Sequence, residues 1–451
     1  MAQQSSRALC QMNQYFGTDG IRGAYGSEFI NEAFSYKVGQ AIGAYLQKEN
    51  QDKPIVAIAS DTRPSGSSLK ESVILGLRSM AVQAIDYGVV PTPALAFGVL
   101  KHAANFGVMI TASHNPSDDN GIKCFSAQGT KLRLEQELAL ESLIGHEHST
   151  AEPPKETEYR SILDEYLKNL ETYFSGLDLS GLSIAVDSAN GATSETTYRI
   201  LESLGANVLK IHHGDGVINS ECGSENLKSL QALVLQKKAD LGIAHDGDGD
   251  RVRFVDAEGK VIEGDQVLGL IARQAHLEKN LKSETFVSTV HSNSGVFSFL
   301  NEHAIHSLTS DVGDRNVYLK MLESNSNWGG ESSGHIICTD YLPTGDGLFA
   351  ALYVLRAMKV QSKTLACLAS EVKLWPSLSG SFPVSQKPAI DSIPDLSLSV
   401  AREKDYLNEE GRILLRYSGT EPKLRLLVEG QSLEKISASY QRISLAIEKS
   451  L

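Results

Sequence analysis

The sequence predicts an α/β protein made of three serial α/β domains, with mixed and largely parallel sheets, followed by a smaller α+β domain. Two observations predict this class. Short apolar runs alternate with amphipathic helical segments through most of the chain, which is typical of βαβ units. Residues 372–451 instead show paired strands and a terminal helix. A length of 451 residues allows about three or four domains.

The first expected domain covers residues 1–157 and begins the alternation. Residues 54–59 form an apolar run that predicts a buried strand, and residues 106–111 predict another. Between them, apolar residues recur at the spacing of one helix face at Leu69, Val73, Leu77 and Met80. The polar segment 146–158 contains two adjacent prolines, so we expect a linker there.

The second and third expected domains cover residues 158–257 and 258–371. Apolar runs at residues 182–186 and 241–244 predict buried strands, each followed by a helix. A turn between two short strands, at residues 256–259, marks the boundary between the two domains.

The fourth expected domain covers residues 372–451 and is of the α+β class. Residues 411–417 and 423–428 are expected to form paired strands. Residues 432–449 are expected to form the terminal helix, because apolar residues recur there at Leu433, Ile436, Tyr440, Ile443 and Ile447.

Three of the expected strands run directly into loops of acidic and small residues. These loops lie at residues 58–63 (IASDTR), 185–191 (AVDSANG) and 243–251 (IAHDGDGDR). Ligands of open α/β sheets bind beyond the carboxyl ends of the strands. We therefore expect functional side chains in these loops.

Charge and cysteine content exclude several classes of protein. The net charge is −13, which argues against nucleic acids and anionic membrane surfaces as partners. The five cysteines are widely spaced and form no Cys-x-x-Cys pair, which argues against a disulfide framework or a thiolate zinc site and favours a reducing compartment. The first 15 residues lack the apolar core of a signal peptide, and no apolar run reaches ~18 residues. We expect a soluble, cytoplasmic protein.

The run Asp246-Gly-Asp248-Gly-Asp250-Arg251 follows an apolar strand directly. Glycine lets the backbone curl, so that alternate carboxylates can converge on one point. Three convergent carboxylates suit a hard divalent cation, Mg²⁺ in particular. The loop is not an EF-hand, because Arg251 stands where the required glycine would be. The alternative is a solvated acidic turn.

Ser113 lies in the run Thr111-Ala-Ser-His-Asn-Pro116, at the end of an expected buried strand. A serine exposed at the ligand edge of a sheet can carry a phosphoryl group while a metal ion neutralises its charge. Lys123 follows nearby and could act as a general acid or base, or stabilise charge. The alternative is a turn without chemistry.

The glycine-rich run at residues 329–335 (GGESSGH) has the composition of a loop that binds a polyhydroxy ligand. Glu331 and Ser333 can form hydrogen bonds with sugar hydroxyls or an amine, and His335 could assist proton transfer. The alternative is a flexible polar loop without chemistry.

Two further segments are candidate phosphate sites. Near the C-terminal end, hydroxyls, backbone N–H groups and guanidinium groups can surround an anion that does not react. The residues concerned are Arg416, Ser418, Gly419, Thr420 and Arg425. The alternative there is a hairpin turn with incidental arginines. Near the N-terminus, residues 16–23 (FGTDGIRG) form a candidate active-site loop in which Arg22 would face a phosphate.

Together and in this order, the five motifs resemble the α-D-phosphohexomutase superfamily. The match extends from Phe16 to Arg425 and looks most like the branch that acts on glucosamine phosphates. The resemblance implies four domains around a central cleft. It also implies interconversion of glucosamine 6-phosphate and glucosamine 1-phosphate through a phosphoserine enzyme and a hexose 1,6-bisphosphate. This small phosphosugar is the expected partner, and the resemblance leaves a homodimer open.

The resemblance also implies a role for each motif residue. Ser113 would be the phosphoserine, and one Mg²⁺ per subunit would bind Ser113, Asp246, Asp248 and Asp250. Arg22 and Arg251 would lie near the reacting phosphate, with Lys123 and His335 as acid or base candidates. Glu331 and Ser333 would read the sugar, and Arg416, Ser418, Gly419, Thr420 and Arg425 would hold the distal phosphate. The chain departs from the usual pattern at Cys124, where an apolar or aromatic residue is more usual, and at Ser332, where glutamine is usual.

Three alternative functions remain at this stage. A phosphomannomutase or phosphoglucomutase would share the chemistry and differ only in the sugar. A Mg²⁺-dependent phosphosugar phosphatase would use Asp246 as its nucleophile, but it would leave Ser113 and the arginine loop without a role. A non-catalytic phosphosugar-binding protein would not need Ser113 at all.

Overall fold

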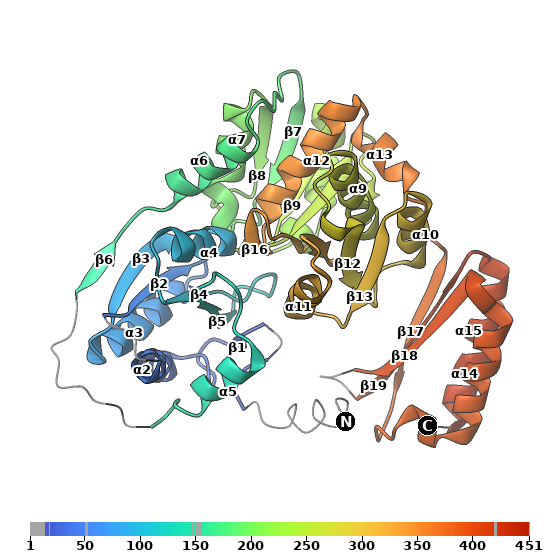
Figure 1. Cartoon of the computed structure of the whole chain (residues 1–451), viewed down its shortest axis with the longest axis horizontal. Helices are drawn as coiled ribbons and strands as arrows, with labels where there is room; N and C mark the ends of the chain where they lie inside the picture. Colours follow the sequence, from blue (N-terminus) through green and yellow to red (C-terminus); the bar gives the residue numbers. More distant parts are fainter. Residues whose placement is uncertain are drawn as a thin grey trace. The chain divides into compact units, whose positions relative to one another are not determined.

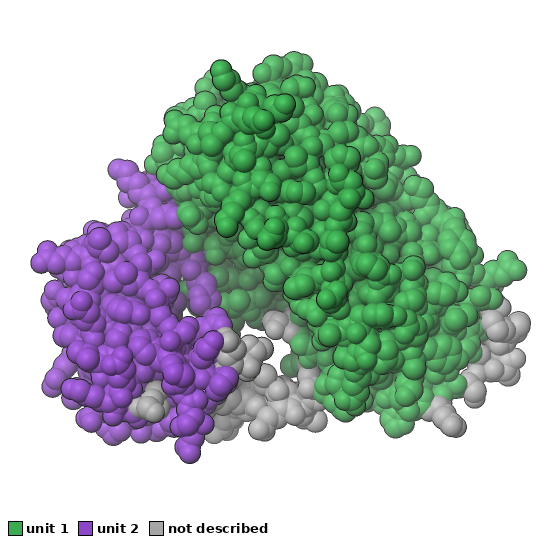
Figure 2. Space-filling model, turned by 180° about the vertical axis from the view of Figure 1, so that it is seen from behind, with its two compact units in different colours: residues 1–290, 305–370 green, residues 291–304, 371–451 purple. Residues whose placement is uncertain are grey.

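The structure is a computed structural model that describes residues 14–17, 19–49, 53–146, 148, 156–418 and 422–450. The chain forms two compact units, coloured separately in Figure 2. Unit 1 comprises residues 1–290 and 305–370, and unit 2 comprises residues 291–304 and 371–451.

The first sheet of unit 1 has six strands in the order β1-β5-β4-β2-β3-β6 (Figure 1). Strands β2, β3, β4 and β6 are mutually parallel, whereas β5 runs antiparallel to both β1 and β4. The strands are β1 (Ile21–Ala24), β2 (Ile55–Ser60), β3 (Gln83–Val89), β4 (Phe106–Ile110), β5 (Asp119–Ser126) and β6 (Thr157–Tyr159). The helices are α2 (Glu32–Lys48), α3 (Gly66–Ser79), α4 (Thr92–Lys101) and α5 (Leu134–Glu141).

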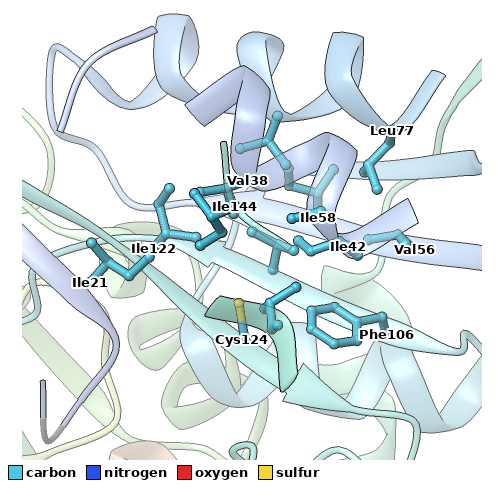
Figure 3. Close-up of a cluster of buried hydrophobic side chains, with 14 of the residues drawn as sticks. Ile21, Val38, Ile42, Val56, Ile58, Leu77, Phe106, Ile122, Cys124 and Ile144 are labelled. Carbon is cyan, nitrogen blue, oxygen red and sulfur yellow. The ribbon is translucent and has the colours of Figure 1, made fainter. Parts of the chain in front are cut away.

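The core of this first domain lies between the sheet and helices α2 and α3 (Figure 3). Val38 and Ile42 of α2 and Leu77 of α3 belong to one buried cluster with Phe106 of β4. Cys124 of β5 belongs to the same cluster, and burial raises the pKa of its thiol. A buried cysteine behaves as a small apolar side chain. The departure from the family pattern at this position is therefore a change in core packing.

The second sheet has five strands in the order β11-β10-β9-β7-β8. Strand β7 pairs in parallel with β8 and β9, whereas β10 is antiparallel to β9 and β11. The strands are β7 (Ser183–Asp187), β8 (Asn207–Ile211), β9 (Leu241–His245), β10 (Val252–Asp256) and β11 (Val261–Ile262). The helices are α6 (Leu163–Tyr173), α7 (Thr197–Ser203) and α8 (Lys228–Lys237), with short 3₁₀ turns η1 (Ala192–Glu195) and η2 (Gly223–Glu225).

The third sheet also has five strands, in the order β13-β12-β14-β15-β16. Strand β12 is parallel to β13 and β14, and the remaining pairs are antiparallel. The strands are β12 (Thr285–Thr289), β13 (His306–Ser310), β14 (Trp328–Gly330), β15 (Ile336–Cys338) and β16 (Leu342–Gly345). The helices are α9 (Gly264–Leu277), α11 (Asp314–Ser324), α12 (Gly347–Gln361) and α13 (Leu365–Glu371), with the 3₁₀ turn η3 (Lys282–Glu284). No helix in the described part of the chain has the length and apolar character that a membrane span requires.

Unit 2 contains a three-stranded antiparallel sheet in the order β17-β19-β18, with a core of its own. Its elements are β17 (Ser377–Pro383), β18 (Gly411–Tyr417), β19 (Lys423–Gly430), α14 (Pro394–Leu407), α15 (Leu433–Ser450) and the 3₁₀ turns η4 (Ile390–Ser392) and η5 (Asn408–Glu410). Helix α10 (Ser294–Glu302) joins this unit, because Glu429 of β19 accepts hydrogen bonds from the Asn293 side chain and the Ser294 backbone N–H. This helix also falls within residues 258–371, the range expected for the third domain.

The predicted fold class is confirmed, and most predicted elements agree within one or two residues. Examples are β2, β4, β7, β9, β18 and α15. The linker was expected to extend to residue 158, but Thr157–Tyr159 already forms β6 at the edge of the first sheet. The turn expected at residues 256–259 lies between β10 and β11, and β11 extends the second sheet to Ile262.

Candidate active site

The acidic loop between β9 and β10 brings three carboxylates together inside unit 1. Asp246, Asp248 and Asp250 are all buried, and one carboxylate oxygen from each lies within 4.8 Å of the others. Gly249 has a φ of +72°, which the turn requires and which glycine adopts without cost. A Cβ atom on Gly247 would lie 2.7 Å from the Ser113 carbonyl oxygen. The two glycines therefore allow both the tight turn and its close contact with the Ser113 loop.

Ser113 lies directly against this acidic loop. Its side chain is 0% exposed and its Oγ donates a hydrogen bond to Oδ2 of Asp246 at 2.7 Å. The backbone at Ser113 is left-handed, with a φ of 55°. That conformation is unfavourable for residues other than glycine, and such strain is concentrated at functional sites. Ser113 thus directs its hydroxyl toward the carboxylates at an energetic cost.

Lys123 extends from β5 into the same cluster. Its Nζ atom lies 2.7 Å from Asp248 Oδ2, 3.1 Å from Asp250 Oδ2 and 3.3 Å from a carboxylate oxygen of Asp19. Burial alone lowers the pKa of the ammonium group, but the charges of these carboxylates outweigh it and raise the pKa. Lys123 is therefore cationic in this arrangement and holds part of the negative charge in place.

The carboxylate cluster fits a divalent cation. Asp248 Oδ1 and Asp250 Oδ1 are buried and have no hydrogen-bond partner among the described residues. Burial and the charges of Asp250 and Asp248 raise the pKa of Asp246 well above its usual range. A hard divalent cation with oxygen ligands would satisfy these oxygens and offset their repulsion. The donor set is the one that Mg²⁺ prefers.

Arg251 and His335 border the acidic loop. The Arg251 backbone N–H donates to Asp246 Oδ1 at 3.2 Å, and its guanidinium Nε lies 4.0 Å from Asp250 Oδ1. His335 is 3% exposed, with Nε2 at 3.4 Å from Asp314 Oδ2 and 4.0 Å from Asp250 Oδ2. Neither ring nitrogen makes a hydrogen bond within the part of the chain that the structure describes. The imidazole is thus placed beside the carboxylates with hydrogen-bonding capacity left for a substrate.

Glu331 and Ser333 lie in the turn between β14 and β15, four and two residues before His335, respectively. Glu331 accepts a hydrogen bond from the Gly313 backbone N–H at 2.9 Å. The Ser333 hydroxyl is buried without a hydrogen-bond partner among the described residues. Gly334 has a φ of +97° and packs against the backbone of Val252, which follows the acidic loop. This close packing brings the sugar-reading candidates to the edge of the acidic loop.

Arg22 of β1 forms an ion pair with Asp19 of the same predicted loop, residues 16–23, and Asp19 is the centre of a network that extends beyond that loop. Asp19 also forms ion pairs with Lys123 and with Lys131, and Lys131 pairs with Asp314 at 2.5 Å. Lys131 belongs to none of the predicted motifs, because it lies in the turn after β5. The network thus connects β1, β5 and the segment after β5 to the start of α11.

Arg63 and Asn219 hold the Ser113 loop, and sequence reasoning gave neither a role. The buried Arg63 guanidinium donates to the backbone carbonyls of Ser113, Asn115, Pro116 and Asp119, and to the Asp61 carboxylate. The Asn219 amide donates to the Ser113 and Asn115 carbonyls at 2.8 and 2.9 Å. Arg63 is the last residue of the predicted loop at 58–63, and this position just after a strand is the one sequence feature that could have indicated its role.

The candidate phosphate loop lies in unit 2, between β18 and β19. Arg416 and Arg425 are direct cross-strand partners, so their side chains lie on the same face of the sheet. Ser418 is buried, and its carbonyl accepts a hydrogen bond from Lys387 at 2.6 Å. Gly419 and Thr420 lie outside the described residues. The described part of this loop thus gathers positive side chains at the end of one hairpin.

Comparison with known proteins agrees with this architecture. Four family models match the chain in order, described as the three alpha/beta/alpha domains and the C-terminal domain of phosphoglucomutase/phosphomannomutase. They match residues 13–151, 164–259, 263–374 and 382–444. A phosphoglucosamine mutase of Pelotomaculum thermopropionicum is 39% identical, covering 96% of this chain and 98% of the relative. One of Limosilactobacillus fermentum is 38% identical, covering 96% and 97%.

Solved structures show the same fold at lower identity. A phosphoglucomutase/phosphomannomutase family protein of Burkholderia thailandensis has a TM-score of 0.80 and 23% identity, covering 96% of this chain and 97% of its own. An Aspergillus fumigatus N-acetylphosphoglucosamine mutase, solved with GlcNAc-6P and magnesium, has a TM-score of 0.66 and 17% identity, covering 99% of both chains. The resemblance read from the motifs is thereby confirmed. The chain belongs to the phosphoglucosamine mutase family, within the α-D-phosphohexomutase superfamily.

Proposed function

We propose that the protein interconverts glucosamine 6-phosphate and glucosamine 1-phosphate, with Ser113 as the phosphoryl carrier. The observation that carries the proposal is the pairing of the strained, buried Ser113 with Asp246 at the carboxylate cluster. Full-length relatives that are phosphoglucosamine mutases support the choice of sugar. The product would feed the synthesis of amino-sugar nucleotides and cell-wall precursors.

The phosphoryl group moves twice in this proposal. Phosphorylated Ser113 donates its group to glucosamine 6-phosphate, which gives the 1,6-bisphosphate. The bisphosphate then turns around in the site, because one serine has to reach both ends of the sugar. Ser113 takes the other phosphoryl group, which leaves glucosamine 1-phosphate. A hexose 1,6-bisphosphate is thus both intermediate and activator.

The residues around Ser113 divide the work by their positions. Arg22 and Arg251 stabilise the charge of the transferring group. Lys123 and His335 are the candidates for moving a proton to or from the sugar hydroxyl, and the lack of a hydrogen bond to either His335 ring nitrogen among the described residues supports that role. Positioning and charge stabilisation account for most of the catalysis in phosphoryl transfer.

Asp246, Asp248 and Asp250, together with Ser113, would hold one Mg²⁺. When bound, the ion supplies positive charge against the phosphoryl oxygens. Without it, the buried carboxylates and a phosphorylated Ser113 would repel one another. Asp250 and Asp248 also hold Lys123 in place, so the acidic loop has a structural role besides metal binding.

The remaining site residues would bind the parts of the substrate that do not react. Glu331 and Ser333 would form hydrogen bonds with the sugar, and the buried Ser333 hydroxyl, which has no hydrogen-bond partner among the described residues, supports this role. Arg416 and Arg425 would bind the distal phosphate, together with Ser418, Gly419 and Thr420. We also propose domain boundaries near residues 157, 257 and 371, and a cytoplasmic location, supported by the cysteine usage.

A coupled assay with a panel of sugars tests the proposal. The phosphates of glucosamine, glucose and mannose are compared, each with a hexose 1,6-bisphosphate activator and Mg²⁺. We expect the highest kcat/KM with glucosamine phosphate. Higher activity on mannose 1-phosphate would assign the protein to the phosphomannomutase branch. Inorganic phosphate as the main product, with phosphate mapped to Asp246, would indicate a phosphatase.

A further inference from the structure

A second cluster of potential metal ligands lies in the second sheet of unit 1, apart from the acidic loop. Asp187 ends β7, His212 follows β8, and Cys222 directly precedes η2. One ligand atom from each residue lies within 4.8 Å of the others. Asp187 and Cys222 are buried, whereas the His212 side chain is 29% exposed. The cluster therefore has a buried base and an opening to solvent on the imidazole side.

We propose that Asp187, His212 and Cys222 bind a thiophilic first-row divalent cation, Zn²⁺ above all. Carboxylate, imidazole and thiolate ligands together suit Zn²⁺ and disfavour Mg²⁺, which takes oxygen ligands. Metal binding replaces the thiol proton of Cys222, which leaves to the buffer. Three protein ligands leave the fourth tetrahedral position for solvent.

The present geometry is close to that of a zinc site. His212 Nδ1 and Asp187 Oδ2 lie 2.9 Å apart, and nitrogen and oxygen ligands on one tetrahedral zinc ion lie about 3.3 Å apart. Backbone N–H groups already orient the carboxylate, because Ala189 donates to Oδ1 at 2.8 Å and Gly223 donates to Oδ2 at 3.1 Å. Binding of one zinc ion would therefore increase the distance between the Asp187 and His212 ligand atoms by about 0.4 Å.

The Cys222 sulfur also has a neighbour that suits a thiolate. The Asn190 amide donates to Cys222 Sγ at 3.9 Å, and such outer contacts tune a metal ligand. Asp187 lies in the predicted loop at residues 185–191, but the spacing of the three ligands along the chain follows no recognised zinc motif. Parallel pairing of β7 with β8 places Asp187 opposite Ile211, the residue before His212.

A bound cation would fix the segment that supports the Ser113 loop. Asn219 lies between His212 and Cys222, and its amide donates to the carbonyls of Ser113 and Asn115. Its backbone N–H donates to the Ala189 carbonyl at 2.9 Å. A metal held at both ends of residues 212–222 restrains Asn219 from two sides.

Cobalt binding to the full-length protein tests the proposal, because a thiolate ligand gives Co²⁺ a near-ultraviolet charge-transfer absorption that carboxylates do not. Co²⁺ is titrated in excess Mg²⁺, so that the acidic loop is occupied. We expect one equivalent of thiolate-bound Co²⁺ in the wild type, displaced by Zn²⁺, and none in Cys222→Ser. Cys367→Ser is the matched control, because Cys367 is exposed, and it should retain the absorption.

Two further measurements keep the proposal falsifiable if Cys222→Ser folds poorly. His212→Ala alters a partly exposed side chain and should weaken Co²⁺ binding at least tenfold. Zn²⁺ should raise the Tm of the wild type and slow amide exchange in residues 212–223. Absence of the absorption in the wild type, or its loss in Cys367→Ser, would overturn the proposal. So would unchanged binding in His212→Ala.

Discussion

At the scale of single residues, the site depends on one unfavourable backbone conformation and on the side chains that enforce it. Ser113 is left-handed at φ 55°, and its carbonyl accepts hydrogen bonds from both Arg63 and Asn219. A strained conformation persists only where its surroundings over-determine it. The position of the Ser113 hydroxyl therefore depends on Arg63 and Asn219 as much as on Ser113 itself.

Replacing Arg63 with lysine should reduce kcat more than it raises KM. Lysine keeps the charge but lacks the planar fork that serves four carbonyls and Asp61 at once. We expect kcat to fall by about 10- to 100-fold, as for a misplaced reacting group. Steady-state kinetics give the two constants, and intact mass gives the phosphorylation of Ser113. Arg199→Lys, at a surface ion pair with Asp164, should change neither. A pure KM effect would contradict the positioning role.

Replacing Ser113 with alanine should abolish the covalent step. We expect turnover to fall by roughly three orders of magnitude or more, as for other covalent nucleophiles. The neighbouring Ser117→Ala is the control, because the Ser117 hydroxyl contacts only the exposed Asp118 carboxylate among the described residues. Coupled assays measure turnover, and mapping after incubation with bisphosphate should find phosphate only on wild-type Ser113 and on Ser117→Ala. Retained turnover in Ser113→Ala would show that another residue carries the phosphoryl group.

At the scale of elements, the β9–β10 turn and the Ser113 loop fit together through backbone contacts. Gly247 leaves room for the Ser113 carbonyl, and the Gly191 backbone carries no side chain against Gly247. A side chain at either glycine would separate the nucleophile from the carboxylates. Secondary structure alone does not bring these loops together, because they belong to different sheets.

Replacing Gly247 with alanine should therefore impair both folding and activity. The new Cβ would lie 2.7 Å from the Ser113 carbonyl oxygen and 2.8 Å from the Asn219 amide nitrogen. Overpacking of this kind costs about 1–3 kcal/mol, so we expect a lower Tm and at least tenfold lower turnover. Gly66→Ala is the matched control, because its Cβ would meet nothing closer than 3.5 Å at the start of α3. Equal Tm values for the two variants would contradict this account.

Helix α12 begins at a buried carboxyl whose protonation should affect stability. Asp346 accepts hydrogen bonds from the Phe349 N–H and the Tyr166 hydroxyl, yet burial raises its pKa to about 6 from 3.8. The folded state thus favours the neutral acid. Its contribution to stability is complete below pH 3.8 and is lost as the pH rises through 6. A pKa change of this size corresponds to about 3 kcal/mol.

The variant Asp346→Asn should remove this pH dependence while keeping the cap. We expect the Tm of the variant minus the Tm of the wild type to increase as the pH rises from 4 to 7. Thermal unfolding in a series of buffers measures the difference. Asp395→Asn, at an exposed position in α14, should follow the wild type throughout. A difference that is constant with pH would mean that Asp346 does not titrate in this range.

At the scale of the whole molecule, the net charge of −13 does not show that basic and acidic side chains are paired at the candidate site. Four ion pairs connect the first domain to the acidic loop and to the third domain: Lys123–Asp248, Lys123–Asp250, Lys131–Asp314 and Arg315–Glu137. Net charge influences solubility and the rate at which molecules associate, but it does not describe the charge at a single binding site. An acidic chain can therefore bind phosphosugars.

Removing divalent cations should weaken unit 1 as well as stop catalysis. A ligand that binds only the folded state stabilises it by mass action. We expect a chelator to abolish turnover and to lower the Tm, and excess Mg²⁺ to restore both. Asp248→Asn should reduce the Mg²⁺-dependent rise in Tm. A Tm that does not respond to Mg²⁺ in the wild type would contradict metal binding at this cluster.

The sequence by itself determined the fold class, several of the strands and the motifs that carry the candidate residues. These features are local: apolar periodicity predicts β2, β7 and β9, and a glycine-spaced run of aspartates marks the acidic loop. The sequence also indicated the family, because five motifs in one order rarely arise by chance. Element ends were less certain, since β6 is short and is fixed by pairing with β3.

Only the tertiary structure decided which residues support those motifs. Lys131 and Asn219 lie in no predicted motif, whereas Asp19 and Arg63 lie in predicted loops that did not indicate their partners. The roles of all four residues arise from contacts between segments that are distant along the chain. The same holds for the cluster of Asp187, His212 and Cys222, which the sequence spreads over 36 positions. The local periodicity of apolar residues indicates which side chains of a segment are buried. Which loops come into contact is decided by the packing of the sheets against one another.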